Sequence, residues 1–137
     1  GGQMAPTSLI GQKTTTSPTG RASETTGHPI GVCELLASLP GVAYLARVPI
    51  SSPKNIMVAK KHMRKAIRAQ LENKGLGLVE FLSTCPVQWA MSPIAAMKHI
   101  DNTVIKTFPP GIFVDRVDPA TQEPTPMPAV THAGAEA

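Results

Sequence analysis

Apolar residues follow two different periods along the chain, and these predict an alternation of helices and strands. Residues 42–48 and 76–82 are short apolar runs next to Gly or Pro, which is typical of strands buried on both faces of a parallel sheet. Apolar positions three and four residues apart predict helices over residues 29–39, 53–74 and 92–105. A helix between two strands favours a βαβ unit, so we expect an α/β fold with a parallel sheet.

The helix predicted over residues 53–74 has the clearest ends. Ser51 or Ser52 can cap it, Pro53 suits its first turn, and Gly75 suits the position after its last turn. Its apolar positions form one stripe, which we expect to pack on the core: Ile56, Ala59, Met63, Ile67 and Leu71.

The two ends of the chain differ in composition from the middle. Residues 1–28 are rich in Gly, Ser and Thr without a sustained period, so we expect an irregular segment. Residues 118–137 contain four Pro and little bulky apolar content, which predicts a disordered tail. The predicted folded part is residues 29–117, and with two strands it is a partial α/β domain.

The positive charge is concentrated in the helix predicted at residues 53–74. The chain has 13 Lys and Arg, 9 Asp and Glu and a net charge of +4, and seven of the basic residues lie from Lys54 to Lys74. No aromatic side chain lies among them to stack on bases, so nucleic acid is not the expected partner. Two interpretations remain, a solvated helix face or a docking surface for an acidic protein.

Two short motifs could take part in chemistry. Gly1, Gly2 and Gln3 could bring backbone amides and a side-chain amide close to an anionic cofactor, or could be a flexible end. Cys85 follows the second predicted strand, where ligands collect in parallel sheets, so it is either a metal or cluster ligand or a small buried side chain. Cys33 lies among leucines on a predicted helix and is expected to pack in the core.

Several other function classes lack support. The motifs of serine hydrolases, P-loop proteins and zinc proteases are absent from the sequence, and two cysteines are too few for a disulfide scaffold or a four-ligand zinc site. No apolar run approaches the roughly 20 residues that span a bilayer, so we expect a cytoplasmic protein without a membrane partner. The histidines show no metal-ligand spacing: His28, His62, His99 and His132.

Three blocks of sequence resemble one enzyme family. Residues 1–21, 33–48 and 79–93 read GGQMAPTSLIGQKTTTSPTGR, CELLASLPGVAYLARV and VEFLSTCPVQWAMSP. Together they are similar to the carboxyl-terminal half of the β subunit of 2-oxoacid:ferredoxin oxidoreductases, and most similar to the 2-oxoglutarate and branched-chain 2-oxoacid enzymes. The resemblance runs from Gly1 to about Val117. It implies that the fold is the carboxyl-terminal half of a parallel-sheet thiamine-diphosphate-binding domain, with residues 1–28 as a loop beside the cofactor.

The resemblance also implies three cofactors: thiamine diphosphate, Mg²⁺ and a [4Fe-4S] cluster. Gly1, Gly2 and Gln3 match the end of the family's diphosphate-binding segment, and Cys85 matches its late cluster cysteine. Lys13 is a candidate for contact with a substrate carboxylate. The family's Gly-Asp-Gly metal-binding segment and its other cluster cysteines do not occur in this sequence, so we expect the chain alone to lack complete cofactor sites and activity.

The implied reaction is decarboxylation of a 2-oxo acid, with 2-oxoglutarate expected. Coenzyme A takes the acyl group, and electrons pass through the cluster to ferredoxin. The implied protein partners are an α subunit, and γ and δ subunits where the complex has them. The alternative is a non-catalytic subunit or interaction module of the same fold, which binds an acidic protein through the helix at residues 53–74.

Overall fold

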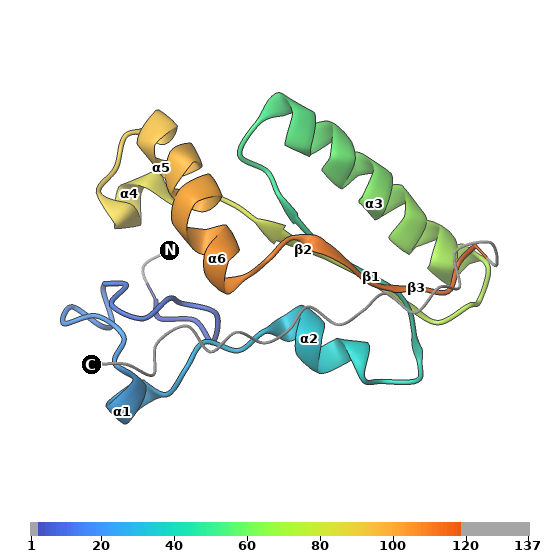
Figure 1. Cartoon of the computed structure of the whole chain (residues 1–137), viewed down its shortest axis with the longest axis horizontal. Coiled ribbons are helices and arrows are strands. Elements are labelled where there is room, and N and C mark those ends of the chain that lie inside the picture. Colours follow the sequence, from blue (N-terminus) through green and yellow to red (C-terminus); the bar gives the residue numbers. More distant parts are fainter. Residues whose placement is uncertain (1–2, 119–137) are drawn as a thin grey trace.

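The described chain is a small α/β fold around a three-stranded sheet (Figure 1). The computed structural model describes residues 3–118, so Gly1, Gly2 and the predicted tail beyond Asp118 lie outside the described residues. The strands lie in the order β2-β1-β3 and have these bounds: β1 (Val42–Pro49), β2 (Leu76–Leu82) and β3 (Gly111–Asp115).

The sheet is mixed, which corrects the prediction of a parallel sheet. β2 runs parallel to β1, but β3 runs antiparallel to it. β3 was missed because it is only five residues long and follows Pro109 and Pro110, which suggested a loop.

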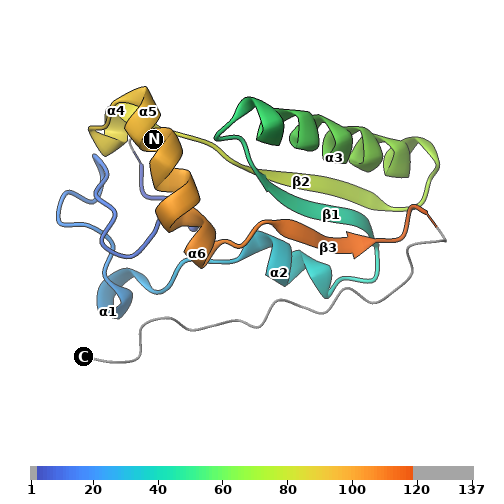
Figure 2. The ribbon, with the colours of Figure 1, turned by 45° about the horizontal axis from the view of Figure 1, so that its top comes forward.

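Helices cover both faces of the sheet (Figure 2). α3 (Pro53–Leu71) joins β1 to β2 and packs on one face, while α2 (Val32–Ala37) packs on the other. The remaining helices lie towards the carboxyl ends of β1 and β2: α1 (Ser23–Thr26), α4 (Pro86–Trp89), α5 (Pro93–His99), the π-helical turn η1 (Ile100–Val104) and α6 (Ile105–Thr107).

Local signals in the sequence located most of these elements. β2 has the predicted bounds, and β1 extends one residue beyond the prediction. α3 begins as predicted, because the Ser52 hydroxyl accepts a hydrogen bond from the Asn55 backbone N–H at 3.2 Å. The helix expected over residues 92–105 is present as α5, η1 and α6 in succession, whereas the helix expected over residues 29–39 is shortened to α2.

The prediction that the apolar stripe of α3 faces the core is wrong for four of its five members, and Ala59 alone among them is buried. Its four bulky members are between 42% and 78% exposed: Ile56, Met63, Ile67 and Leu71. The helix buries only small side chains against the sheet, which are Ala59 of the stripe together with Ala66 and Ala69. The cause is a close approach to β2, since a Cβ atom at Gly77 would lie 2.2 Å from the Ala66 carbonyl oxygen.

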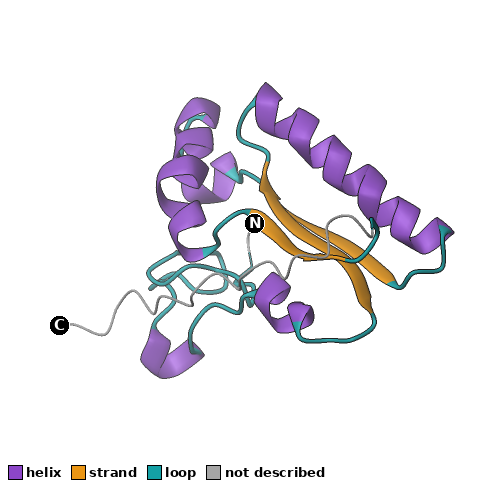
Figure 3. Cartoon of the chain, turned by 45° about the vertical axis from the view of Figure 1, so that its right-hand side comes forward, coloured by secondary structure: helices purple, strands orange, loops and turns teal. Residues whose placement is uncertain are grey.

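β2 lies at an edge of the sheet, and β1 lies at its centre. Figure 3 shows the strands in orange and the helices around them in purple. The apolar sequence of β2 predicted a strand covered on both faces, but Leu76 is 41% exposed and Phe81 is 36% exposed. In residues 3–118, no helix is long and apolar enough to cross a bilayer.

Candidate functional site

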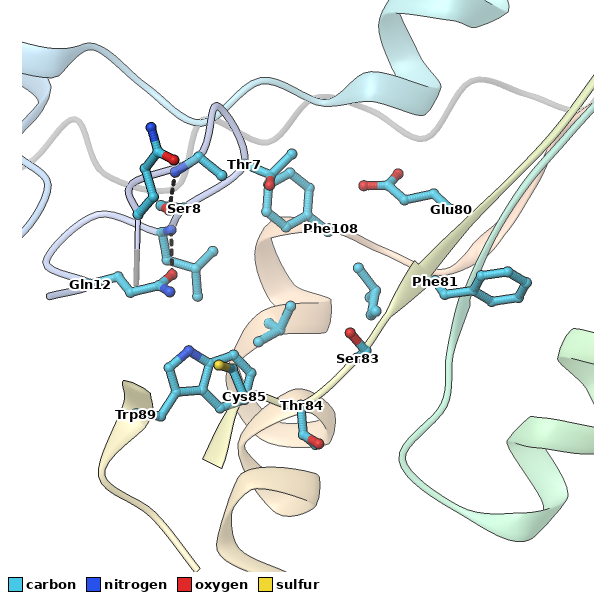
Figure 4. A pocket seen from close by; sticks show the side chains of 15 residues that line it. Thr7, Ser8, Gln12, Glu80, Phe81, Ser83, Thr84, Cys85, Trp89 and Phe108 are labelled. Carbon is cyan, nitrogen blue, oxygen red and sulfur yellow. Dashed lines mark hydrogen bonds between the residues drawn. The ribbon is translucent and has the colours of Figure 1, made fainter. Parts of the chain in front are cut away.

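A cavity of about 350 Å³ opens beyond the carboxyl end of β2. This volume is within the range of small-molecule sites, and the carboxyl ends of parallel strands are where such sites form in α/β sheets. Three segments that are far apart in the sequence line it (Figure 4): the loop at residues 3–12, the end of β2 with the turn into α4, and the helical stretch that carries Val104 and Phe108.

The cavity has an apolar side and a polar side. Leu82 and Phe108 are buried in a hydrophobic cluster, against which Leu9, Trp89 and Val104 pack. The polar lining consists of uncharged amides and hydroxyls and one carboxylate: Gln3, Thr7, Ser8, Gln12, Ser83, Thr84 and Glu80. No Lys or Arg is among the described lining residues.

The loop at residues 3–12 is shaped by its own side chains. The Ser8 hydroxyl accepts a hydrogen bond from the Ala5 N–H, and the Gln12 side-chain oxygen accepts one from the Leu9 N–H, both at 2.9 Å (Figure 4). These bonds fold the loop into successive turns, so its backbone is fixed where it faces the cavity.

Arg21 joins this loop to the segment that follows it. Its guanidinium is buried, with the residue 6% exposed, and donates hydrogen bonds of 2.8–3.2 Å to six backbone carbonyls: Ala5, Pro6, Ser8, Thr26, Gly27 and His28. A guanidinium has five N–H donors, more than any other side chain, and it reaches six acceptors here because two carbonyls share one N–H of the NH1 group. The predicted irregular segment is therefore ordered around one arginine, which sequence analysis did not identify because no periodicity marks such a role.

Cys85 lines the cavity at the start of α4. It is the residue before the helix, Pro86 occupies the first helical position, and Ala90 ends the helix in the left-handed region at a φ of 50°. The Cys85 side chain is partly exposed and lies beside the Trp89 indole in Figure 4. Its thiol is thus accessible from the cavity, which a ligand to a metal or cluster must be.

Below the cavity, a buried ion pair network crosses the sheet. Arg47 on β1 is 1% exposed and donates to Glu34 at 2.7 and 2.8 Å and to Glu80 at 2.7 Å. Burial opposes the charged form of Arg47, but the bonds to Glu34 and Glu80 outweigh it and raise the pKa of the guanidinium. Phe108 and Phe113 lie within 5.2 Å of the guanidinium carbon, measured to the ring centroids. In the sequence, the sign of this network was one charged residue, Arg47, within the apolar run at residues 42–48.

Cys33 belongs to this network and is buried, as predicted. Its thiol donates to Glu80 at 3.1 Å. Burial, followed by the hydrogen bond to Glu80, raises the pKa of the Cys33 thiol well above its usual range. Cys33 is therefore a structural residue, and Cys85 is the accessible thiol.

Only some of the predicted site residues meet at the cavity in the described part of the chain. Gln3 and Cys85 line the same cavity, although they are distant in the sequence. Lys13 is exposed and is not among the described lining residues, and Gly1 and Gly2 lie outside the described part of the chain. Among the histidines, His62 shares a hydrogen bond with the Tyr44 hydroxyl between α3 and the sheet, a contact that sequence analysis missed.

The described residues do not form a complete site for the implied cofactors. In residues 3–118, no three His, Cys, Asp or Glu side chains come together in a way that could hold a metal ion. The cavity supplies Cys85 alone as a thiol, whereas a [4Fe-4S] cluster takes four. Its described lining residues also include no Lys or Arg that could neutralise a diphosphate.

Comparisons with known proteins relate the chain to one group of enzymes. It is 39% identical over 116 residues to the ketoisovalerate oxidoreductase subunit VorA of Methanothermobacter thermautotrophicus, which covers 85% of this chain. It is 33% identical over 127 residues to the 2-oxoglutarate synthase subunit KorB of Archaeoglobus fulgidus, again covering 85% of this chain. The chain is homologous to subunits of 2-oxoacid:ferredoxin oxidoreductases.

The homology covers part of each relative. The chain spans 24% of the VorA subunit and 43% of the KorB subunit. No protein-family model matches the chain, and no solved structure matches it. The homology to subunits of these oxidoreductases agrees with the resemblance of the three sequence blocks.

Proposed function

We propose that the chain is part of the β subunit of a 2-oxoacid:ferredoxin oxidoreductase, in which it forms one wall of the thiamine diphosphate site. The observation that carries this proposal is the meeting of Gln3 and Cys85 in one cavity beyond the carboxyl end of β2. By the resemblance, these residues match the two sequence motifs that the family uses for its cofactors. Gly1, Gly2 and Gln3 would contact the diphosphate side, and Cys85 would be one ligand of a [4Fe-4S] cluster.

In this proposal, thiamine diphosphate supplies the electron sink for decarboxylation of the 2-oxo acid. This chain orients the ligand through the loop at residues 3–12, which Arg21 holds, and its apolar lining excludes water from one side. Mg²⁺, the remaining cluster ligands and the groups that bind coenzyme A come from outside the described residues. An α subunit and ferredoxin are the proposed protein partners.

Within the 2-oxo acids, the lining favours one with an apolar side chain. Leu9, Leu82, Trp89, Val104 and Phe108 offer apolar contacts. The second carboxylate of 2-oxoglutarate, the substrate expected from sequence, would need a cation from outside the described lining, as the diphosphate would. Lys13 would have to move from its exposed position to supply one. We therefore propose a branched-chain 2-oxo acid ahead of 2-oxoglutarate.

The test is a Cys85→Ser substitution in the intact complex that contains this chain. We expect loss of the visible absorbance and iron of one cluster and loss of ferredoxin reduction that depends on 2-oxo acid and coenzyme A. Cys33→Ser is the matched control and should keep the iron, because Cys33 is bonded to Glu80 in the core. Unchanged iron content in the Cys85 variant contradicts the cluster assignment. A kcat/KM higher for 2-oxoglutarate than for ketoisovalerate contradicts the proposed substrate.

A second role has separate support, namely docking of an acidic protein on the outer face of α3. Lys54, Lys60, Lys61 and Arg64 are exposed and have no ion pair within residues 3–118, whereas Lys65 and Arg68 are paired with acidic side chains. Such a contact would weaken as salt screens the charges. Capture of partner proteins that is insensitive to raised salt would contradict it.

A further inference from the structure

The helical stretch that lines the cavity contains a π turn. In η1, the Ile105 N–H donates to the Ile100 carbonyl, five residues back. The bonds on either side have the ordinary α spacing of four residues. The Ile100 N–H donates to the Ala96 carbonyl, and the Phe108 N–H donates to the Val104 carbonyl. π turns are rare and occur frequently at functional sites, and this one directly precedes a wall of the cavity.

The π turn sets the direction in which the lining side chains point. Ile100, Val104 and Phe108 are four residues apart, and all three belong to the hydrophobic cluster around Leu82. In a regular α-helix a step of four residues passes one full turn by about 40°, so two steps rotate the side chain by about 80°. A π turn holds more residues per turn and takes up part of this rotation. Without it, Phe108 would turn away from Ile100 and from the cavity.

Ser51 anchors the π turn to the end of β1. Its hydroxyl donates to the carboxylate of Asp101, the second residue of η1, at 2.5 Å. The same hydroxyl oxygen accepts from the Asn55 side-chain amide at 3.1 Å, which leaves the hydroxyl hydrogen for Asp101. Ser51 is 5% exposed, whereas Asp101 is exposed. The bond therefore fastens an exposed turn to a fixed position in the core, and a bond to a charged acceptor is of the stronger kind.

We infer that Ser51 and Asp101 are positioning residues for substrate selection. Their hydrogen bond fixes the π turn, and the π turn places Val104 and Phe108 on the apolar side of the cavity. Neither Ser51 nor Asp101 is among the described lining residues, so each acts through the turn. The substrate class that this arrangement selects is a 2-oxo acid with a branched apolar side chain, and this last step rests on the proposed function.

Four variants separate this role from a general loss of stability. Ser51→Ala removes the donor and Asp101→Ala removes the acceptor, whereas Asp101→Asn keeps an oxygen that can accept from Ser51. The control is Ser92→Ala, at the other end of the same helical stretch. It removes a hydroxyl that caps α5, where the hydroxyl accepts from the Ala95 N–H at 3.2 Å.

The first measurement is amide hydrogen exchange in this chain. We expect the Phe108 amide to exchange about tenfold faster in Ser51→Ala and in Asp101→Ala, while the Leu45 amide in the central strand stays protected. The double variant should match either single variant, because both remove the same bond. Ser92→Ala should leave the Phe108 amide unchanged. Unchanged exchange at Phe108 in the first two variants, or effects that add in the double variant, would overturn the inference.

The second measurement is kinetic and uses the intact complex that contains this chain. Ketoisovalerate is compared with 2-oxobutyrate, whose side chain has one methyl group less. We expect the ratio of their kcat/KM values to fall at least about fivefold in Ser51→Ala and Asp101→Ala, because the apolar contacts of the extra methyl group are lost. Asp101→Asn and Ser92→Ala should keep this ratio within about twofold of the parent complex.

Failure of the inference is distinguishable from failure of the proposed function. If Ser51→Ala and Asp101→Ala lower kcat/KM for both substrates in the same proportion, the assignment to substrate selection is overturned, since a purely structural role acts on both alike. A parent complex that turns over no 2-oxo acid contradicts the proposed function. The exchange measurement then still decides whether Ser51 and Asp101 hold the π turn.

Discussion

Arg47 and Glu80 face each other directly across the parallel pair of β1 and β2, and the Arg47 Nε donates to the Glu80 carboxylate at 2.7 Å. The same carboxylate accepts from the Cys33 thiol, and Glu34 holds the other end of the guanidinium. This network ties α2 to both strands under the cavity, and Glu80 also lines the cavity. The rigidity of the cavity floor therefore depends on a buried charge cluster.

The Arg47→Met substitution should destabilise the chain by about 3 kcal/mol, because it leaves two partly buried carboxylates without their cation. The measurement is urea unfolding at neutral pH. Adding Glu34→Gln and Glu80→Gln should restore part of the loss. Arg68→Met is the control and should change stability little, since the pair of Arg68 and Glu72 lies at the surface. Equal effects at Arg47 and Arg68 would show that the network contributes nothing specific.

The Arg21→Lys substitution should loosen residues 3–28 while leaving the sheet intact. A lysine has three N–H donors in place of five, so about half of the six carbonyls should lose their partner, at about 1 kcal/mol each. Hydrogen exchange should become faster in this segment and stay unchanged in β1. Arg64→Lys, at an exposed position, is the control. A uniform change along the chain would contradict a local role for Arg21.

The two cysteines should differ in reactivity. Burial and the bond to Glu80 raise the pKa of Cys33, so little of its thiolate is present near neutral pH, whereas Cys85 opens to the cavity. Brief treatment with iodoacetamide under native conditions should label Cys85, as read by mass spectrometry of peptides. Cys85→Ser should remove nearly all labelling, and Cys33→Ser should leave it unchanged. Labelling of both thiols at one rate would mean that the core is open.

Stability should fall on mild acidification because of His62. Burial, and then the nearby Lys65, lower the pKa of His62, although Asp115 opposes them. The folded state then binds the proton less readily than the unfolded state, so stability is full above the unfolded pKa of about 6.5 and is lost as the pH falls towards the lower folded value. The free energy of unfolding measured at successive pH values from 7.5 to about 5.5 should decrease.

The His62→Gln variant should show a flatter pH dependence in this window. The control is His28→Gln, because His28 is exposed in the N-terminal segment. Glu34 does not interfere here. Burial opposes its charged form, but the Arg47 hydrogen bonds lower the pKa of its carboxyl below 4.5. An unchanged slope in His62→Gln would exclude this residue as the cause.

The sequence predicted elements whose signals are local. Ser52, Pro53 and the apolar run of β2 each act on their immediate neighbours, and their consequences are present in the structure. The orientation of α3 could not be predicted in this way, because it depends on how closely Ala66 approaches Gly77 on another element. A strong apolar period therefore pointed to the wrong side of the helix.

The site residues could likewise be predicted only where they belong to a recognisable sequence motif. Gln3 and Cys85 were identified from motifs, and the fold brings both to one cavity. Arg21 and Arg47 were not identified, because each acts through acceptors that only the folded chain assembles. The apolar lining from Val104 and Phe108 depends on a helical stretch whose placement no local pattern defines.

The cavity is lined by three segments that meet from both ends of the chain, and this has a consequence for the order of folding. β1, α3 and β2 are consecutive, so they can form with short loop closures, whereas the loop at residues 3–12 must reach elements about 70 to 100 positions away. We expect the β1-α3-β2 unit to fold early and the cavity to be completed last. Ligand binding would then depend on this last step, so it would report whether the loop at residues 3–12 has packed against the rest of the fold.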